Sequence, residues 1–393
     1  MEKIIRKGCF LAVGLLIAIF MIPKTVLAAE NIPVTQVADI TDVQNVTSKN
    51  YTVGPGNYKK TVQFKLTKPA YVYVSAYSTV MMEQYYNLGN IRNFAVYSDA
   101  NLSNLVNNDE SQAVNGNQRI SKYLCLDAGT YWIYFAKGAG DEDAAKSNGE
   151  FRLSVAAKYL NVTATKNGSW AKAKAISTDK KVSGFLSSST RASWYKFSVA
   201  EGTAAKMSVS LENPLGVKYF PLSTTGVTLY KSSHKYITSF NVTDQTYYHQ
   251  AFSSNMTLSA GTYYLAVSGD ESYDQWEKTK LVGNEHKNMG VVNLKITTVK
   301  RPSVSKLTNV KGKKMQVSGK TVSGAKGYEV QYALDSKFKK GAKIVNAKGA
   351  KATIKGLQKN KKYYVRIRAY KLDEEGKKLT SAWSTAKSVN IKK

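Results

Sequence analysis

Internal repetition constrains the fold of this chain more than any other feature. Residues 50–157 align with residues 183–298 at a shift of about 133 positions. Four anchors support this alignment: Phe64 with Phe197, Val96-Tyr97 with Leu229-Tyr230, Leu126-Asp-Ala-Gly-Thr-Tyr131 with Leu258-Ser-Ala-Gly-Thr-Tyr263, and Phe151-Arg-Leu-Ser-Val155 with Val292-Asn-Leu-Lys-Ile296. The last anchor is displaced by roughly eight further residues, which predicts an insertion around residues 274–287. The simplest interpretation is two copies of one domain.

Apolar and polar residues alternate with the period of a β-strand in both copies and beyond them. The clearest segments are residues 61–66, 71–77, 131–135 and 363–370, whereas helical periodicity is hard to find. Polar residues at every second position indicate sheets with one face toward water. In each copy, the Gly of Ala-Gly-Thr-Tyr can take positive φ and reverse the chain before the following Tyr re-enters a strand. The predicted fold class is therefore all-β, with tandem β-sandwich domains of the jelly-roll or immunoglobulin-like kind.

The second copy carries a resemblance to a known family. Trp194-Tyr-Lys-Phe197, the strand at Leu229-Tyr230, Leu258-Ser-Ala-Gly-Thr-Tyr-Tyr264 and Leu294-Lys-Ile296 resemble the pattern of pre-peptidase C-terminal domains. The resemblance implies small β-sandwiches that accompany secreted enzymes and surface proteins. The first copy keeps the turn at Gly129 but has Thr61-Val-Gln63 in place of Trp-Tyr-Lys, so it departs further from the family.

The last quarter of the chain resembles a different family. After Lys300-Arg-Pro302 the composition becomes rich in lysine, and residues 325–332 resemble the third strand of a fibronectin type III domain. Leu357 precedes Tyr363 by six residues, like the corner before the sixth strand of such domains, and Trp383 resembles a residue of the final strand. Gly319 stands where the family usually has a core tryptophan, so we expect the core to pack differently there.

The amino terminus has the order of a secretory signal. Lys3, Arg6 and Lys7 precede an apolar run at residues 9–22, and Ala28 and Ala29 are candidate cleavage positions. The run is shorter than the ~20 residues that a membrane-spanning helix needs, although a retained anchor is the alternative.

The predicted organisation is a signal peptide (1–29), two pre-peptidase C-terminal-like sandwiches (30–158 and 159–299) and a fibronectin type III domain (300–393). We expect a secreted, cell-wall-associated protein without a transmembrane segment after signal cleavage.

Charge is distributed unevenly along the chain. The formal net charge is +30, and residues 300–393 hold 26 of the Lys and Arg residues but only five Asp and Glu residues. Such a field attracts polyanions. Because export argues against nucleic acid, the expected partner of residues 300–393 is an anionic cell-wall polymer; a lysine-rich surface that only confers solubility is the alternative.

No motif for catalysis is evident. His234, His249 and His286 do not form the His-Glu-x-x-His spacing of a zinc site, and no Gly-x-Ser-x-Gly elbow occurs. Cys9 leaves with the signal peptide, so the lone Cys125 is expected to be a buried, inert thiol. We therefore expect a protein that is not an enzyme.

Two acidic loops are candidate calcium sites. They follow the Ala-Gly-Thr-Tyr strand of each copy and contain Asp141, Glu142 and Asp143 in the first and Asp270, Glu271 and Asp274 in the second. Ca²⁺ prefers clustered carboxylate oxygens, and some members of the resembled family bind calcium. A solvated turn is the alternative, and no other cofactor is expected.

Aromatic residues in polar, loop-like contexts are candidate ligand contacts. They are Tyr85, Tyr86, Tyr247, Tyr248, Tyr273 and Trp276. Exposed rings can stack on sugars or anchor a protein partner; packing of these rings within the fold is the alternative.

The predicted function is a non-catalytic binding or adhesion protein that recognises an extracellular glycan or protein. The alternatives are a collagen- or protein-binding accessory subunit of a secreted peptidase or other hydrolase, and a hydrolase with an unrecognised site.

Overall fold

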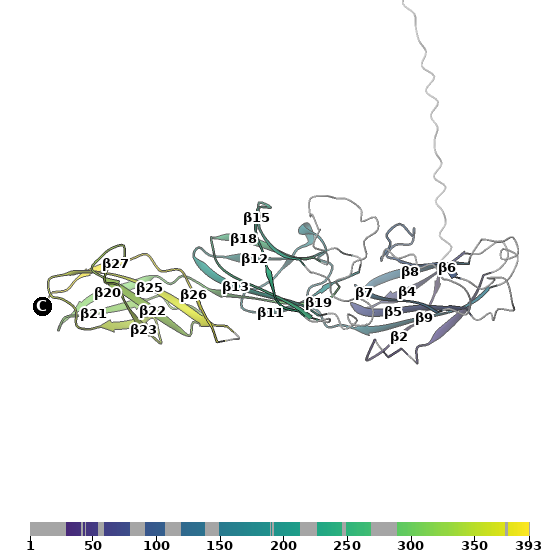
Figure 1. Cartoon of the computed structure of the whole chain (residues 1–393), viewed down its shortest axis with the longest axis horizontal. Coiled ribbons are helices and arrows are strands. Elements are labelled where there is room, and N and C mark those ends of the chain that lie inside the picture. Colours follow the sequence, from purple (N-terminus) through teal and green to yellow (C-terminus); the bar gives the residue numbers. More distant parts are fainter. Residues whose placement is uncertain are drawn as a thin grey trace, which may run out of the picture.

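The computed structural model is a linear series of β-sandwiches (Figure 1). It describes residues 29–392 except 41, 44, 54–58, 79–90, 107–118, 138–148, 189, 191, 213–225, 246–248, 269–288 and 374–375. In the described part, the only helical element is the single 3₁₀ turn η1 (Trp170–Lys172). The sheets group into three modules, which we call the N-terminal, middle and C-terminal modules. The all-β tandem-sandwich prediction is confirmed, while the boundaries drawn from the sequence stay predictions.

The N-terminal module packs two sheets against each other. The first sheet has the order β1-β4-β8-β6, with β1 (Glu30–Asn31), β4 (Lys59–Leu66), β8 (Gly129–Lys137) and β6 (Ile91–Tyr97). The second has the order β2-β9-β5-β7, and β3 also pairs with β9. Its strands are β2 (Val34–Gln36), β9 (Gly149–Tyr159), β5 (Ala70–Ser78), β7 (Arg119–Leu126) and β3 (Ser48–Val53). Side chains that alternate along these strands fill one apolar core between the sheets.

The middle module repeats this topology. One sheet has the order β10-β12-β18-β14-β15, with β10 (Lys174–Ala175), β12 (Ala192–Val199), β18 (Gly261–Ser268), β14 (Gly226–Lys231) and β15 (Tyr236–Ser239). The other has the order β11-β19-β13-β17-β16, with β11 (Lys181–Leu186), β19 (Gly290–Val299), β13 (Thr203–Glu212), β17 (His249–Leu258) and β16 (Asn241–Gln245). Even the short parallel edge strand recurs, since β1 pairs with β4 as β10 pairs with β12.

The repeated turn motif has the same structural role in both modules. Phe64 and Tyr131 are cross-strand neighbours whose rings stack at 5.6 Å, and Phe197 and Tyr263 do the same at 5.7 Å. Each tyrosine also returns its hydroxyl to the start of its own turn. The Tyr131 hydroxyl donates to the Asp127 carbonyl (2.9 Å), and that of Tyr263 donates to the Ser259 carbonyl (3.0 Å). The Ala-Gly-Thr-Tyr pattern therefore encodes a corner that ties a turn to the core.

The C-terminal module is a smaller sandwich with the sheets β20-β21-β24 and β23-β22-β25-β26, and β27 pairs with β25. Its strands are β20 (Val304–Val310), β21 (Lys314–Gly319), β22 (Gly327–Ala333), β23 (Lys343–Ala347), β24 (Lys351–Ile354), β25 (Lys362–Leu372), β26 (Lys378–Thr380) and β27 (Lys387–Asn390). The predicted corner is present, because the Tyr363 hydroxyl accepts a hydrogen bond from the Gln358 amide at 3.1 Å. At Gly319 a Cβ atom would lie 2.9 Å from Ile367 Cδ1, so Ile367 packs against the backbone there and the core differs locally, as expected.

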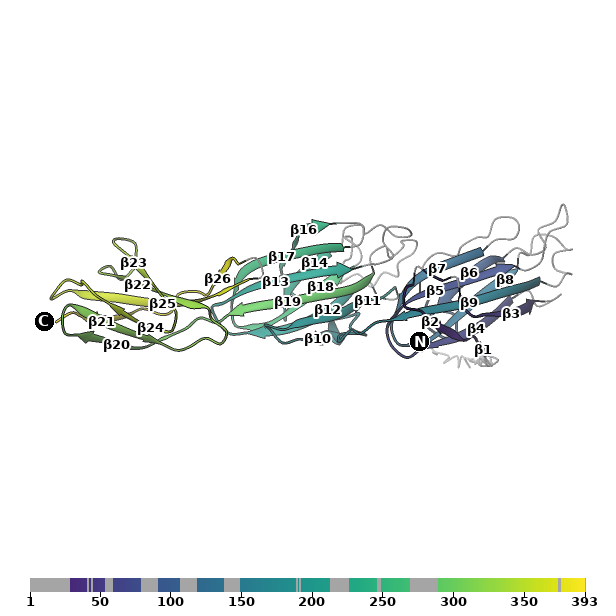
Figure 2. The same cartoon turned by 90° about the horizontal axis from the view of Figure 1, so that it is seen from below.

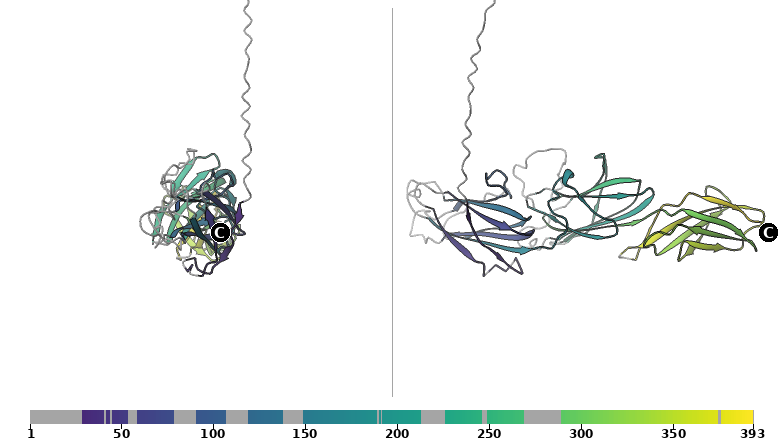
Figure 3. Two further views of the ribbon diagram at one scale, coloured as in Figure 1. Left: turned by 90° about the vertical axis from the view of Figure 1, so that its right-hand side faces the viewer. Right: turned by 180° about the vertical axis from the view of Figure 1, so that it is seen from behind.

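The modules lie head to tail along one axis, as the view at right angles and the end-on view show (Figures 2 and 3). An apolar cluster joins the first two modules and contains Tyr71 and Cys125 from one side and Phe185 and Met289 from the other. Cys125 also exchanges two hydrogen bonds with Ser188 across this junction. Packing of this kind holds the two repeats against each other.

The junction between the middle and C-terminal modules combines apolar and ionic contacts. Ala204 and Val299 of the middle module belong to the apolar core cluster of the C-terminal module. Lys206 lies 2.7 Å from Asp373, and Lys371 lies 2.9 Å from Asp179. Because two pairs cross the junction beside a shared apolar contact, the three modules form a rod.

Candidate binding surfaces

All the loop residues that the sequence singled out lie outside the described residues. This holds for the aromatic candidates Tyr85, Tyr86, Tyr247, Tyr248, Tyr273 and Trp276 and for the acidic candidates Asp141, Glu142, Asp143, Asp270, Glu271 and Asp274. The glycan-contact and calcium predictions for these loops therefore stay predictions. Within the described ranges, no group of three or more His, Cys, Asp or Glu side chains could hold a metal ion.

The described strand ends nevertheless show where these segments start. In the middle module β13 ends at Glu212, β18 ends at Ser268 and β19 begins at Gly290. The pairings of Glu212 with Val291 and of Gly226 with Ser268 place these ends at one end of the sandwich. This end meets the N-terminal module, since the Tyr71 hydroxyl donates to the Glu212 carbonyl at 3.2 Å.

The described residues that were considered for catalysis, Cys125, His249 and His234, pack against other parts of the fold. Cys125 is fully buried, and burial raises the pKa of its thiol well above the usual value, which keeps it protonated at neutral pH. His249 Nδ1 lies 2.7 Å from Glu212 Oε1, at the junction with the N-terminal module. His234 lies in a turn with its ring 4.2 Å from that of Trp170, and His286 falls outside the described residues.

A set of aromatic side chains covers the outer face of one sheet of the middle module. Tyr264 on β18, Tyr230 on β14 and Tyr236 on β15 are successive cross-strand neighbours, so they form one row across the sheet. Trp170 of η1 stacks on Tyr264 at 3.8 Å with an interplanar angle of 13°. Tyr236 is 57% exposed. We call Trp170, Tyr230, His234, Tyr236 and Tyr264 the aromatic surface.

Trp194 lies beneath the aromatic surface. Its ring contacts those of Trp170 at 5.3 Å and Tyr230 at 5.8 Å, and it is only 1% exposed. Its indole Nε1 is buried without a hydrogen-bond partner among the described groups. Buried donors in native proteins are nearly always satisfied, by protein, water or ligand.

Hydroxyl groups border the aromatic surface on both sides. Ser198 and Thr262 are hydrogen-bonded at 2.9 Å in the row on one side, and Thr228 and Ser239 at 3.3 Å in the row on the other. Lys196 is the cross-strand neighbour of Tyr264 and extends the aromatic row. The surface is therefore aromatic at its centre and polar at its border.

Sequence reasoning missed this surface. It looked for binding residues in loops and not on the faces of strands. Trp194, Tyr230 and Tyr264 occupy outward positions of three different strands, and each strand by itself shows only ordinary alternation. The available signal was an aromatic residue at a polar-face position of each of these three strands.

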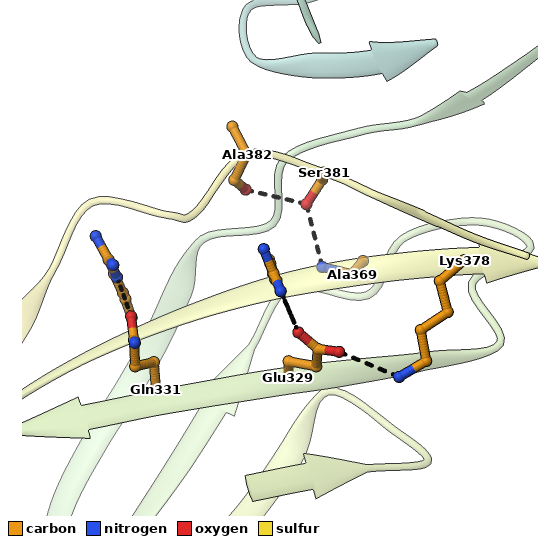
Figure 4. Close-up of polar contacts among 8 residues, drawn as sticks. Glu329, Gln331, Ala369, Lys378, Ser381 and Ala382 are labelled. Atoms are coloured by element: carbon orange, nitrogen blue, oxygen red, sulfur yellow. Dashed lines mark hydrogen bonds and ion pairs between the residues drawn. The ribbon is translucent and has the colours of Figure 1, made fainter. Parts of the chain in front are cut away.

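In the C-terminal module, two arginines pack against aromatic rings. The guanidinium of Arg366 on β25 lies 4.2 Å from the Phe338 ring centroid and 4.9 Å from that of Trp383, and the guanidinium of Arg368, also on β25, lies 4.4 Å from the Trp383 centroid. Arg366 donates to Gln331 Oε1 at 2.7 Å, and Arg368 pairs with Glu329 (Figure 4). Burial, together with the charge of Arg368, lowers the pKa of Arg366, but an arginine stays protonated.

Two serine side chains hold the segment that carries Trp383. The Ser381 hydroxyl accepts from the Ala369 amide at 3.1 Å and donates to the Ala382 carbonyl (Figure 4), and Ser384 accepts from the Ile367 amide at 3.0 Å. These bonds fasten the segment to β25 and keep the indole between the arginines. Both arginines are engaged within the module, so most of the charge left for an external partner comes from its lysines.

The ion pairs of Glu329 are expected to stabilise the C-terminal module. Its carboxylate is buried, which by itself raises its pKa, but bonds from Arg368 and Lys378 outweigh burial and hold the pKa below the usual value. A depressed folded-state pKa means that the stabilisation is present at neutral pH and is lost as pH falls below about 4.5 through the folded pKa. We expect Glu329→Gln to destabilise the module by about 1–2 kcal/mol at pH 7.

Hydrogen exchange of β22 and β25 as a function of pH measures this effect. The variant should lose most of the acid dependence that the parent shows in these strands, while Glu201→Gln, at an exposed carboxylate of the middle module, should not change it. Equal protection of parent and Glu329→Gln at pH 7 would show that the ion pairs do not stabilise the module.

Lysines gather at the free end of the C-terminal module. The segments 311–313, 355–361 and 390–392 meet there, since the Leu357 amide donates to the Lys313 carbonyl and the Asn360 amide to the Ile391 carbonyl. These segments contain no Asp or Glu. The exposed lysines that they contribute, which we call the basic tip, are Lys311, Lys313, Lys355, Lys359, Lys361 and Lys392. The tip lies at the end of the rod opposite the N-terminal module (Figure 2).

The acids that the structure describes in this module do not pair with the lysines of the tip. Glu329 pairs with Arg368 and Lys378, and Asp373 pairs with Lys206 of the middle module. Asp335 accepts from three backbone amides in its own turn, those of residues 337, 339 and 340. The three acids described in the module are thus engaged away from the tip, and a positive field remains there.

Similarity to known proteins is found among solved structures. No family model matches the chain, and no curated protein matches it. Among solved structures, it is similar to the pre-peptidase C-terminal domain of a collagenase from Bacillus anthracis, with 20% identity, coverage of 32% of this chain and 94% of that domain, and a TM-score of 0.22. It is also similar to the FN5 domain of Drosophila Lar (21% identity, 24% and 98% coverage, TM-score 0.20) and to the sixth fibronectin type III domain of human fibronectin type III domain containing protein 3 (17% identity, 24% and 86% coverage, TM-score 0.20).

The structural neighbours thus include both families that the sequence resembles, each over a quarter to a third of the chain. Within the described residues, no helix combines the length and the apolar character that a membrane span requires.

Proposed function

We propose that this chain is a secreted, non-catalytic binding protein that the basic tip attaches to an anionic polymer of the cell envelope. Six exposed lysines at the free end of the rod, on segments without acids, carry this proposal. Its support is electrostatic, because such a concentration of one sign of charge attracts a polyanion without any shaped pocket. The N-terminal and middle modules then extend away from the attachment point and present surfaces to an extracellular glycan or protein.

A charge-reversal variant tests the attachment. We expect Lys311→Glu, Lys313→Glu and Lys359→Glu together to weaken binding to purified, teichoic-acid-containing cell wall by at least about tenfold in 50 mM salt. Parent binding should be lost near 0.5 M salt, where the Debye length falls below ~5 Å. Co-sedimentation with the wall fraction measures both effects.

A matched control separates the tip from net charge. Lys337→Glu, Lys340→Glu and Lys343→Glu change the charge of the same module equally, at exposed positions away from the tip. This control should retain most of the binding. Equal loss in both variants would mean that only net charge matters, and binding that is insensitive to salt would contradict electrostatic attachment altogether.

A further inference from the structure

We propose that the aromatic surface of the middle module is a saccharide-binding site. This inference rests on the proposed function in one respect, namely that the chain is a binding protein, and it assigns the recognition role to one sheet face. The site is distinct from the basic tip, which lies in another module.

The ring geometry suits the apolar faces of pyranose units. Tyr264, Tyr230 and Tyr236 lie in one row across three strands, and strands in a sheet are spaced about 4.8 Å apart. Trp170 stacks on Tyr264 and covers one face of that ring, so the row offers a series of contacts through Trp170, Tyr230 and Tyr236 rather than a single pocket. An extended chain of sugar rings can follow such a row, whereas a small, isolated ligand would use only part of it.

The border of the surface suits sugar hydroxyls. The pairs Ser198–Thr262 and Thr228–Ser239 flank the row, and hydroxyls can both donate to and accept from a sugar. The Tyr236 hydroxyl is also fixed, because it accepts from the Ser239 amide at 3.0 Å. Aromatic rings at the centre with hydroxyl groups on both sides match a ligand that alternates C–H faces with hydroxyls.

The composition of the face disfavours a protein partner. Outward positions on β12, β18 and β14 hold aromatic, hydroxyl, lysine, alanine and glycine residues, and no aliphatic residue larger than alanine. Protein interfaces normally surround aromatic anchors with a desolvated apolar core. The same positions hold no Asp or Glu, so acidic sugars are not repelled.

Trp194 supports the rings of the aromatic surface from below. Its buried indole N–H lacks a partner among the described groups although its ring supports Trp170 and Tyr230. Trp194 is thus a positioning residue that holds the exposed rings.

The test is binding of the full chain to an array of hexose, N-acetylhexosamine and uronate oligosaccharides in 0.5 M salt, where attraction through the basic tip is suppressed. We expect binding to at least one class, at least about tenfold weaker in Tyr236→Ala and in Trp170→Ala. Tyr236→Phe keeps the ring and should stay within about threefold of the parent. Tyr77→Ala, at an exposed tyrosine of the N-terminal module, should bind like the parent.

Three outcomes would overturn the inference: no binding to any class of oligosaccharide, binding that Tyr236→Ala leaves unchanged, or binding of a triple-helical Gly-Pro-rich peptide but of no glycan. The basic-tip variant should bind the array like the parent while it loses the wall fraction. The saccharide site and the attachment proposal can therefore fail separately.

Discussion

Gly184→Ala is expected to destabilise the middle module by about 3 kcal/mol or more, because a Cβ atom at this position would meet the hydroxyl of Tyr195. Gly184 lies on β11, opposite Val292 of β19, and Tyr195 is completely buried in the core. A ring enclosed on all sides cannot swing away, so the strand itself must move. The glycine is required here by close approach and not by its backbone angles.

Hydrogen exchange of β11 and β19, together with thermal unfolding, measures this effect. In the same background, Tyr195→Phe should restore part of the lost stability, because it removes the oxygen that clashes. That hydroxyl is buried without a hydrogen-bond partner in the described part of the chain, so Tyr195→Phe alone should cost little. Gly349→Ala is the matched control, since nothing lies within 4 Å of its Cβ position. Parent-like stability of Gly184→Ala would show that the two residues do not approach closely.

Phe64→Ala and Phe197→Ala are expected to cost about 3–5 kcal/mol each, in different modules. Both rings are nearly fully buried, and each stacks on the tyrosine of its Ala-Gly-Thr-Tyr corner. Truncation removes buried apolar area, leaves a cavity and takes away the partner of that tyrosine. The repeat relationship thus predicts two similar losses at positions about 133 residues apart.

Module-resolved hydrogen exchange distinguishes the two variants. Phe64→Ala should lower protection in β4 and β8, and Phe197→Ala in β12 and β18, with the C-terminal module unchanged in both. A loss of less than about 1 kcal/mol in either variant would contradict the equivalence of the two cores. Phe338 packs against Arg366 in the C-terminal module, so Phe338→Ala should leave the first two modules unaffected.

Local patterns were sufficient for most of the fold. Alternation with period two predicted the strands, and all four anchors of the repeat fall on equivalent strands, such as β4 with β12 and β9 with β19. The Ala-Gly-Thr-Tyr motif is local because the tyrosine hydroxyl bonds to a carbonyl only four residues earlier. The different core packing at Gly319 could also be predicted, because a neighbouring side chain must fill the space of the missing one. That neighbour is Ile367.

The candidate sites were predicted far less well. The loop tyrosines and acids lie outside the described residues, so the structure does not decide on them. The aromatic surface was missed because its members come from η1, β14, β15 and β18, and only sheet register brings them into one row. The excess of basic residues was evident from composition, but its concentration at one tip required the contacts of Lys313 and Ile391.

The sequence by itself determined the kind of modules, their repetition and the sign of the charge, because strand period, corner motifs and composition are properties of contiguous residues. Tertiary structure alone decided which side chains share a surface. Register between strands and the pairing of distant segments set those neighbours, as for Tyr230 beside Tyr264 and Lys313 beside Leu357. In the middle module, the register depends on how core residues such as Tyr195 and Phe197 pack the two sheets together, and that packing is a long-range property of the folded chain.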